Sequence, residues 1–142
     1  MEMSEYVQRL GGSEKLYDKI VKLQSIANNL CPEKIEDYFL SEYKKENGTR
    51  ILENFWFFSP KYAMESKRIY QEGNNIDIMC IDEYIDRYEI NYDMKEAYDN
   101  SILSINCITT TSVIIMKATG FNCDKLWSLF EKYIKPNLYK AD

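Results

Sequence analysis

The sequence predicts an α+β fold: a strongly bent antiparallel sheet of about seven strands, capped by a C-terminal amphipathic helix and preceded by an N-terminal helical extension. Apolar residues recur with helical period over residues 1–32, with strand period through the middle of the chain, and with helical period again near its end. An Asn-Gly pair at residues 47–48 predicts a tight hairpin. Pro32 ends the first helical pattern, so we divide the chain into an extension (1–32) and a β domain (33–142).

Two helices are expected in the extension. The first covers Ser4–Leu10 and ends at Gly11-Gly12, and Ser13 caps the second, with Glu14 in its first turn. The second helix has one apolar stripe, which suits docking on the rest of the domain. The stripe comprises Leu16, Ile20, Leu23, Ala27 and Leu30.

Residues 35–43 fit either a helix or a strand, because three of their apolar residues are four apart. The Asn-Gly pair favours a strand, since a type I′ turn needs positive φ at both of its central positions. Folding the chain about this pair sets Phe39 opposite Trp56 and Tyr43 opposite Leu52.

The remaining strands are separated by turn residues. In Arg87–Tyr92 the side chains of Tyr88, Ile90 and Tyr92 are expected to point inward. Leu103, Ile105 and Cys107 are expected to share one face of their strand. The strands expected besides 35–43 are residues 51–58, 62–70, 76–81, 87–92, 103–107 and 113–119.

The terminal helix is predicted to begin at Asn122 as its cap, with Asp124 in the first turn, and to end at Pro136. Its broad apolar face includes Trp127, which is expected to pack on the sheet.

This order of elements resembles the pleckstrin-homology-like superfold, in its bacterial and GRAM-type versions. The seven successive strands, the tight first hairpin and the aromatic face of the last helix carry the resemblance, over roughly residues 35–138. The resemblance implies a binding module for phosphoinositide headgroups, peptides or proteins. A four- or five-stranded sheet with helices on one face fits the same pattern.

The chain contains no histidine. A Ser-His-Asp triad, a Cys-His pair and a His-bearing zinc site are therefore impossible within it. We expect a non-catalytic protein that carries neither a cofactor nor a metal.

The net charge is −5, which argues against nucleic-acid binding and against adsorption to anionic membranes. The polar start and the absence of long apolar runs predict no secretory signal and no membrane span, hence a cytoplasmic protein. The four cysteines are expected to be reduced and buried; they are Cys31, Cys80, Cys107 and Cys123.

The partner is predicted to be another protein, bound by an acidic, Tyr-rich surface, as in an inhibitor, an immunity-type protein or an assembly subunit. Tyrosines cover a large contact area at a small entropy cost. The candidate contacts are Tyr84, Tyr92, Tyr98 and Tyr139, all beside carboxylates.

Phosphoinositide or membrane-surface binding is one alternative. The basic residues Lys44, Lys45 and Arg50 flank the Asn-Gly pair and could clamp a phosphate. Two glutamates lie among them and the whole chain is acidic, which favours a solvated hairpin tip of mixed charge over a lipid site.

A metal-dependent, nuclease-like enzyme is the other alternative. Glu65-Ser66-Lys67 resembles the E-x-K strand of PD-(D/E)xK nucleases, with Asp37 or Glu53 as the earlier carboxylate. The helix–strand order of that fold is missing, and no basic surface is expected. A further carboxylate cluster, whose spacing fits no calcium loop, comprises Asp82, Glu83 and Asp86.

Overall fold

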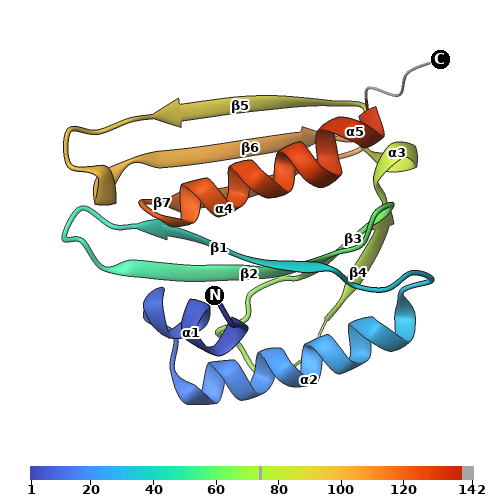
Figure 1. The fold of residues 1–142 in the computed structure, drawn as a ribbon, viewed down its shortest axis with the longest axis horizontal. Helices are drawn as coiled ribbons and strands as arrows, with labels where there is room; N and C mark the ends of the chain where they lie inside the picture. Colours follow the sequence, from blue (N-terminus) through green and yellow to red (C-terminus); the bar gives the residue numbers. More distant parts are fainter. Residues whose placement is uncertain (74, 139–142) are drawn as a thin grey trace.

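The computed structural model describes residues 1–73 and 75–138, and in this part of the chain seven antiparallel strands form two sheets (Figure 1). Sheet A has the order β1-β2-β3-β4, and sheet B has the order β5-β6-β7. The α+β class is thereby confirmed. The strands are β1 (Asp37–Lys44), β2 (Arg50–Phe58), β3 (Tyr62–Ser66), β4 (Asp77–Cys80), β5 (Arg87–Asp93), β6 (Ile102–Ile108) and β7 (Val113–Thr119).

The sequence predicted one strongly bent sheet, and this prediction is wrong. The seven strands form two separate sheets, which are not closed into a barrel. The short helix α3 (Ile81–Tyr84) separates β4 from β5 along the chain. At the other junction β1 lies beside β7, but the two strands do not pair through their backbones.

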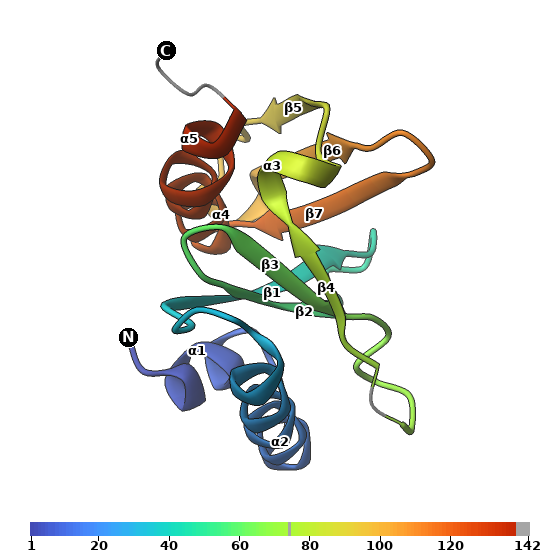
Figure 2. The same ribbon diagram turned by 90° about the vertical axis from the view of Figure 1, so that its right-hand side faces the viewer.

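Helices cover both faces of sheet A (Figures 1 and 2). The helices α1 (Met3–Arg9) and α2 (Glu14–Leu30) lie on one face, and α4 (Asn122–Leu129) lies between the other face and sheet B. A π-helical turn, η2 (Phe130–Ile134), and α5 (Lys135–Leu138) continue α4. Over residues 1–73 and 75–138, we find no helix with the length and apolarity that crossing a bilayer requires.

Sheet A is buried on both faces, which explains the aromatic run in β2. Trp56 and Phe58 point into the core shared with sheet B and α4, whereas Phe55 and Phe57 point into the core formed with α1 and α2. All four side chains are at most 1% exposed. Alternate strand residues face opposite sides, so each core receives two of these rings.

The first hairpin confirms one predicted pair and shifts the other. Phe39 lies opposite Trp56 as expected, but Tyr43 lies opposite Ile51 and not Leu52. The register changes at a β-bulge beside Ser41, because β2 has one residue more than β1 in this region.

The turn of this hairpin is not the type I′ turn that was predicted. Gly48 has a φ of +85°, whereas Asn47 does not have positive φ. The Gly48 N–H donates to the Lys45 carbonyl at 2.9 Å, and the Asn47 side chain accepts from the Thr49 N–H at 3.0 Å. Asn47 thus acts through its side chain, and Gly48 alone supplies the left-handed residue.

Strand β3 ends four residues earlier than predicted. Arg68 takes a φ of +53°, which ends the strand, and the Asn54 side-chain carbonyl accepts a hydrogen bond from its N–H at 3.2 Å. Ile69 then turns into the core beneath α2, where it is 2% exposed.

The C-terminal helix differs from its prediction in three respects. Asn122 is its first residue but does not cap it, because its side chain is used in a buried network. Pro136 does not end the helix but lies inside α5, directly after the π-helical turn, in which the Lys135 N–H donates to the Phe130 carbonyl. Trp127 is 43% exposed and therefore does not fill the core.

Gly120 joins β7 to α4 at a position where a side chain should destabilise the fold. Its φ is +55°, and an added Cβ would lie 3.2 Å from the Asp99 backbone. Gly48 has a similar φ of +85° but open space around it. We expect Gly120→Ala to lower the free energy of unfolding by about 3 kcal/mol, from backbone strain plus overpacking, and Gly48→Ala by about 1 kcal/mol. Urea denaturation measures both, and equal losses would contradict this account of the junction.

Candidate functional site

An apolar pocket opens between sheet B and α4. Its volume is about 290 Å³, and one of the six described residues that line it, Asp124, is charged. The others are Ile90, Tyr92, Leu103, Cys123 and Trp127. We call this site the β5–α4 groove.

Two half-exposed aromatic rings rim this groove. Tyr92 is 52% exposed and Trp127 is 43% exposed. Trp127 leans on Phe130, with ring centroids 5.7 Å apart, and Phe130 in turn meets Tyr88 edge-on at 4.8 Å. Trp127 is thus packed against buried aromatic rings on one side. The exposed parts of Trp127 and Tyr92 remain accessible at the rim of the groove.

A tyrosine from the connection between β5 and β6 leans on α4 beside the groove. The Tyr98 hydroxyl, in the turn η1 (Tyr98–Asn100), donates to Asp124 Oδ2 at 2.5 Å. This bond stabilises the protonated phenol and raises the pKa of Tyr98 to about 12. Tyr92 lies close enough to affect Tyr98 electrostatically. The contact fixes the connection against the start of α4.

The thiol of Cys123 lines the groove but is not a nucleophile. Burial, followed by the charge of Glu42, raises its pKa to about 11, and the thiol donates to the carbonyls of Ser101 and Ala118. At neutral pH it is therefore protonated.

Over the residues that the structure describes, β5 is an edge strand of sheet B, and its residues Ile90 and Tyr92 line this groove. At the β6–β7 turn, the Thr109 N–H donates to the Ser112 carbonyl at 2.9 Å, so the backbone groups of Thr109 face β7. Because backbone direction alternates along a strand, the backbone groups of Ser104, Asn106 and Ile108 face β5. Alternate residues on β5, namely Tyr88, Ile90 and Tyr92, consequently direct their backbone N–H and C=O groups away from the sheet.

The four tyrosines predicted as partner contacts do not form one cluster. Tyr92 lines the β5–α4 groove, and Tyr98 lies beside it, bonded to the lining residue Asp124. Tyr84 is 56% exposed on α3 and does not line the groove, and Tyr139 lies outside the described residues.

The three predicted phosphate-binding cations are separated by their contacts. Lys44 Nζ donates to the Asp99 carbonyl at 2.8 Å, and Arg50 Nε pairs with Glu42 at 3.0 Å. Lys45 is exposed at the hairpin. Two of the three side chains are therefore engaged inside the protein.

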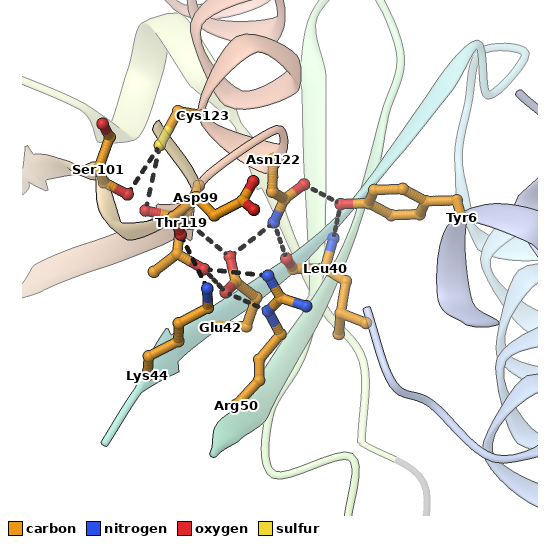
Figure 3. A network of polar contacts seen from close by, with 11 residues as sticks. Tyr6, Leu40, Glu42, Lys44, Arg50, Asp99, Ser101, Thr119, Asn122 and Cys123 are labelled. Atoms are coloured by element: carbon orange, nitrogen blue, oxygen red, sulfur yellow. Dashed lines mark hydrogen bonds and ion pairs between the residues drawn. The ribbon is translucent and has the colours of Figure 1, made fainter. Parts of the chain in front are cut away.

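Glu42 is the most buried carboxylate of this region, with a relative exposure of 0%, and it joins β1 to β7 and α4 (Figure 3). Its Oε1 accepts from Arg50 and from the Thr119 hydroxyl. Its Oε2 accepts from the Thr119 N–H at 2.7 Å and from Asn122 Nδ2 at 2.9 Å. Both oxygens are satisfied by donors, as a structural buried carboxylate requires.

Side chains also bind the backbone of Leu40, at the edge of β1 (Figure 3). Asn122 Nδ2 donates to the Leu40 carbonyl at 2.9 Å, and the Tyr6 hydroxyl accepts from the Leu40 N–H at 3.0 Å. Tyr6 donates to Asn122 Oδ1 at 2.6 Å. The network therefore holds α1, β1 and the start of α4 together, and we call it the Glu42–Asn122 network.

The predicted E-x-K metal site does not assemble with either proposed carboxylate. Glu65 is 7% exposed and accepts from Asn54 Nδ2 at 2.8 Å. Asp37 binds Lys132 and Tyr133, and Glu53 pairs with Lys117 at 3.6 Å. Burial raises the pKa of Glu65 to about 7.

Within residues 1–73 and 75–138, one group of side chains has the spacing of metal ligands. Cys80, Asp82 and Glu83 place their ligand atoms within 4.8 Å of one another, at the β4–α3 junction. The Cys80 thiol donates to Asp82 at 3.0 Å, and this bond raises the pKa of the thiol. The third member of the predicted acidic cluster, Asp86, is not part of this group.

Comparisons with protein-family models, with curated proteins and with solved structures give no match for this chain. The β5–α4 groove is therefore interpreted from its own geometry.

Sequence reasoning found Tyr92 and Tyr98 but missed Asp124 and Trp127 as groove residues. Trp127 lies at the margin of the apolar stripe of α4, one position from the buried Leu126. A large aromatic residue at the margin of a stripe was the available signal.

The Glu42–Asn122 network should make the stability of the fold sensitive to replacing the Glu42 carboxylate by an amide. Glu42→Gln replaces one carboxylate oxygen by an NH₂ group that faces donors, and it removes the partner of Arg50. We expect the free energy of unfolding to fall by about 3 kcal/mol or more. Glu53→Gln, at a partly exposed ion pair, is the matched control and should cost about 0.5 kcal/mol. Similar losses for both in urea denaturation would contradict the role of the network.

Glu65 predicts a pH dependence of stability. The folded chain keeps the Glu65 proton up to about pH 7, whereas an unfolded glutamate releases it near pH 4.5. The resulting stabilisation is present at low pH and is lost as the pH rises towards 7. Thermal unfolding midpoints should fall over this interval, which no histidine complicates. Glu65→Gln should flatten the slope, and an unchanged slope would contradict the assignment.

Proposed function

We propose that this chain is a protein-binding module whose β5–α4 groove takes an extended segment of a partner protein. One observation carries the proposal: β5, which among the described residues pairs with a strand on one side only, runs beside an apolar pocket rimmed by the half-exposed rings of Tyr92 and Trp127.

The edge of β5 supplies the affinity that does not depend on the partner's side chains. An extended segment that lies antiparallel or parallel to β5 can hydrogen-bond the outward backbone groups of Ile90 and Tyr92. Such strand addition would extend sheet B by one strand beyond β5.

The pocket supplies the selectivity. Its volume of about 290 Å³ suits one large apolar side chain, which would pack between Tyr92 and Trp127. Asp124 is the charged residue of its lining, and the chain as a whole has a net charge of −5. The preferred segment therefore carries an apolar anchor and a nearby Lys or Arg.

We also propose that the fold is of the pleckstrin-homology-like type. The support is the order of its elements: four strands in sheet A, three strands in sheet B, and then a helix between the sheets. The helices α1 and α2 form an addition to that order.

A phage-displayed library of random peptides tests the proposed function. Peptides selected on the wild-type protein should contain an apolar anchor and a basic residue. Trp127→Ala and Tyr92→Ala should each weaken their binding more than about tenfold. Tyr84→Ala removes an exposed tyrosine outside the groove and should leave the affinity unchanged.

Hydrogen exchange followed by NMR tests the strand addition. A selected peptide should slow exchange at the amides of Ile90 and Tyr92, while those of Glu89 and Asn91 are already protected by β6. A library that yields no binder, or binders unaffected by Trp127→Ala, would contradict the proposal.

A further inference from the structure

A second groove lies on the opposite side of sheet A. It runs between the first half of α2, the start of β2 and residues 69–73 after β3, and its volume is about 1040 Å³. Figure 2 shows α2 on the face of sheet A that is turned away from α4. We call this site the α2 groove.

Its charge is opposite to that of the whole chain. Lys15, Lys19 and Lys22 are spaced four and three residues apart, so they share one face of α2. Arg50 adds a fourth cation from β2. Among the described lining residues these four cations outnumber the two acidic groups, although the net charge of the chain is −5.

Two of these lysines are available to a ligand. Lys15 and Lys22 are exposed and take part in none of the ion pairs found over residues 1–73 and 75–138. Arg50 is partly engaged by Glu42, with 19% of its side chain exposed. A ligand would therefore meet its strongest electrostatic attraction at Lys15 and Lys22.

The wall facing α2 is held in place before any ligand binds. Lys19 Nζ donates to the carbonyls of Ile69 at 3.0 Å and Gln71 at 2.5 Å. The Ile69 N–H donates to the Glu53 carbonyl at 3.0 Å, and the Ile69 side chain is buried. A preformed groove loses little conformational entropy on binding.

Half-buried apolar side chains contribute to the lining of the groove, among them Leu16, Ile51 and Leu52. A fitting ligand has apolar groups for this surface and anionic groups for the lysines. Its volume of about 1040 Å³ exceeds what one small anion would fill.

We propose that the α2 groove binds an acidic, partly apolar peptide segment of a protein partner. This site is separate from the β5–α4 groove and selects the opposite charge. A chain with both grooves can hold a basic segment on one side of sheet A and an acidic segment on the other. The α2 proposal stands without the proposed function, because the two grooves share no lining residue.

A fluorescein-labelled peptide rich in Glu, with Leu at every third or fourth position, tests the proposal by fluorescence anisotropy. The double variant Lys15→Glu/Lys22→Glu should bind it at least about tenfold more weakly than the wild type. Lys34→Glu/Lys61→Glu makes the same charge change at exposed lysines outside the groove and should change the affinity less than about twofold. Thermal unfolding checks that both variants fold.

Three outcomes would overturn the proposal. One is no binding of the acidic peptide by the wild type, and another is an equal loss in the two double variants, which would indicate unspecific attraction. The third is capture of phosphatidylserine vesicles by the wild type and not by Lys15→Glu/Lys22→Glu, which would assign the groove to a membrane. Trp127→Ala should keep its affinity for the acidic peptide, so failure at one groove is distinguishable from failure at the other.

Discussion

The structure depends on how two strand edges meet without pairing. β1 and β7 lie side by side, and side chains, in place of a backbone ladder, satisfy the groups that face the gap. Ser41 accepts from the Lys117 N–H at 2.9 Å, and Glu42 accepts from the Thr119 N–H at 2.7 Å. The backbone of Leu40, on the same strand, is bound by two further side chains: Tyr6 accepts from its N–H, and Asn122 donates to its carbonyl. Every unsatisfied group here would cost folding free energy, so these few residues decide whether the sheets can pack.

The same network places the helices at both ends of the chain. Asn122 is the first residue of α4, and its bonds to β1 fix where that helix starts relative to both sheets. Tyr6 carries the network into α1, and the aromatic core between α1, α2 and sheet A follows. Burying the Glu42 charge costs solvation, which Arg50 and the hydrogen-bond donors offset. The benefit is one fixed arrangement of the parts that form the two grooves.

The local sequence pattern predicted most of the individual helices and strands, but it did not predict how they connect and pack. Period-two alternation found β5, and the Asn-Gly pair found the first hairpin, because both signals are encoded in neighbouring residues. The use of Asn122 inside the network depends on contacts between residues about 80 positions apart. The split into two sheets and the bulge beside Ser41 likewise leave no mark in the local pattern. The β5–α4 groove was predicted in part, since Tyr92 and Tyr98 were chosen as contacts but Trp127 was assigned to the core. Helical period alone does not tell whether a residue at the margin of a stripe is covered.

The side chains of β5 explain how an open edge can be kept without uncontrolled association. Its solvent face carries Arg87, Glu89 and Asp93, and charged side chains on an edge strand disfavour pairing with a second copy. Its other face carries Tyr88, Ile90 and Tyr92 toward α4, where Trp127 extends the apolar surface. In the binding mode that we propose, a strand that also fills the groove would bind more tightly than one that matches the backbone alone. The edge and the pocket together would then select the partner.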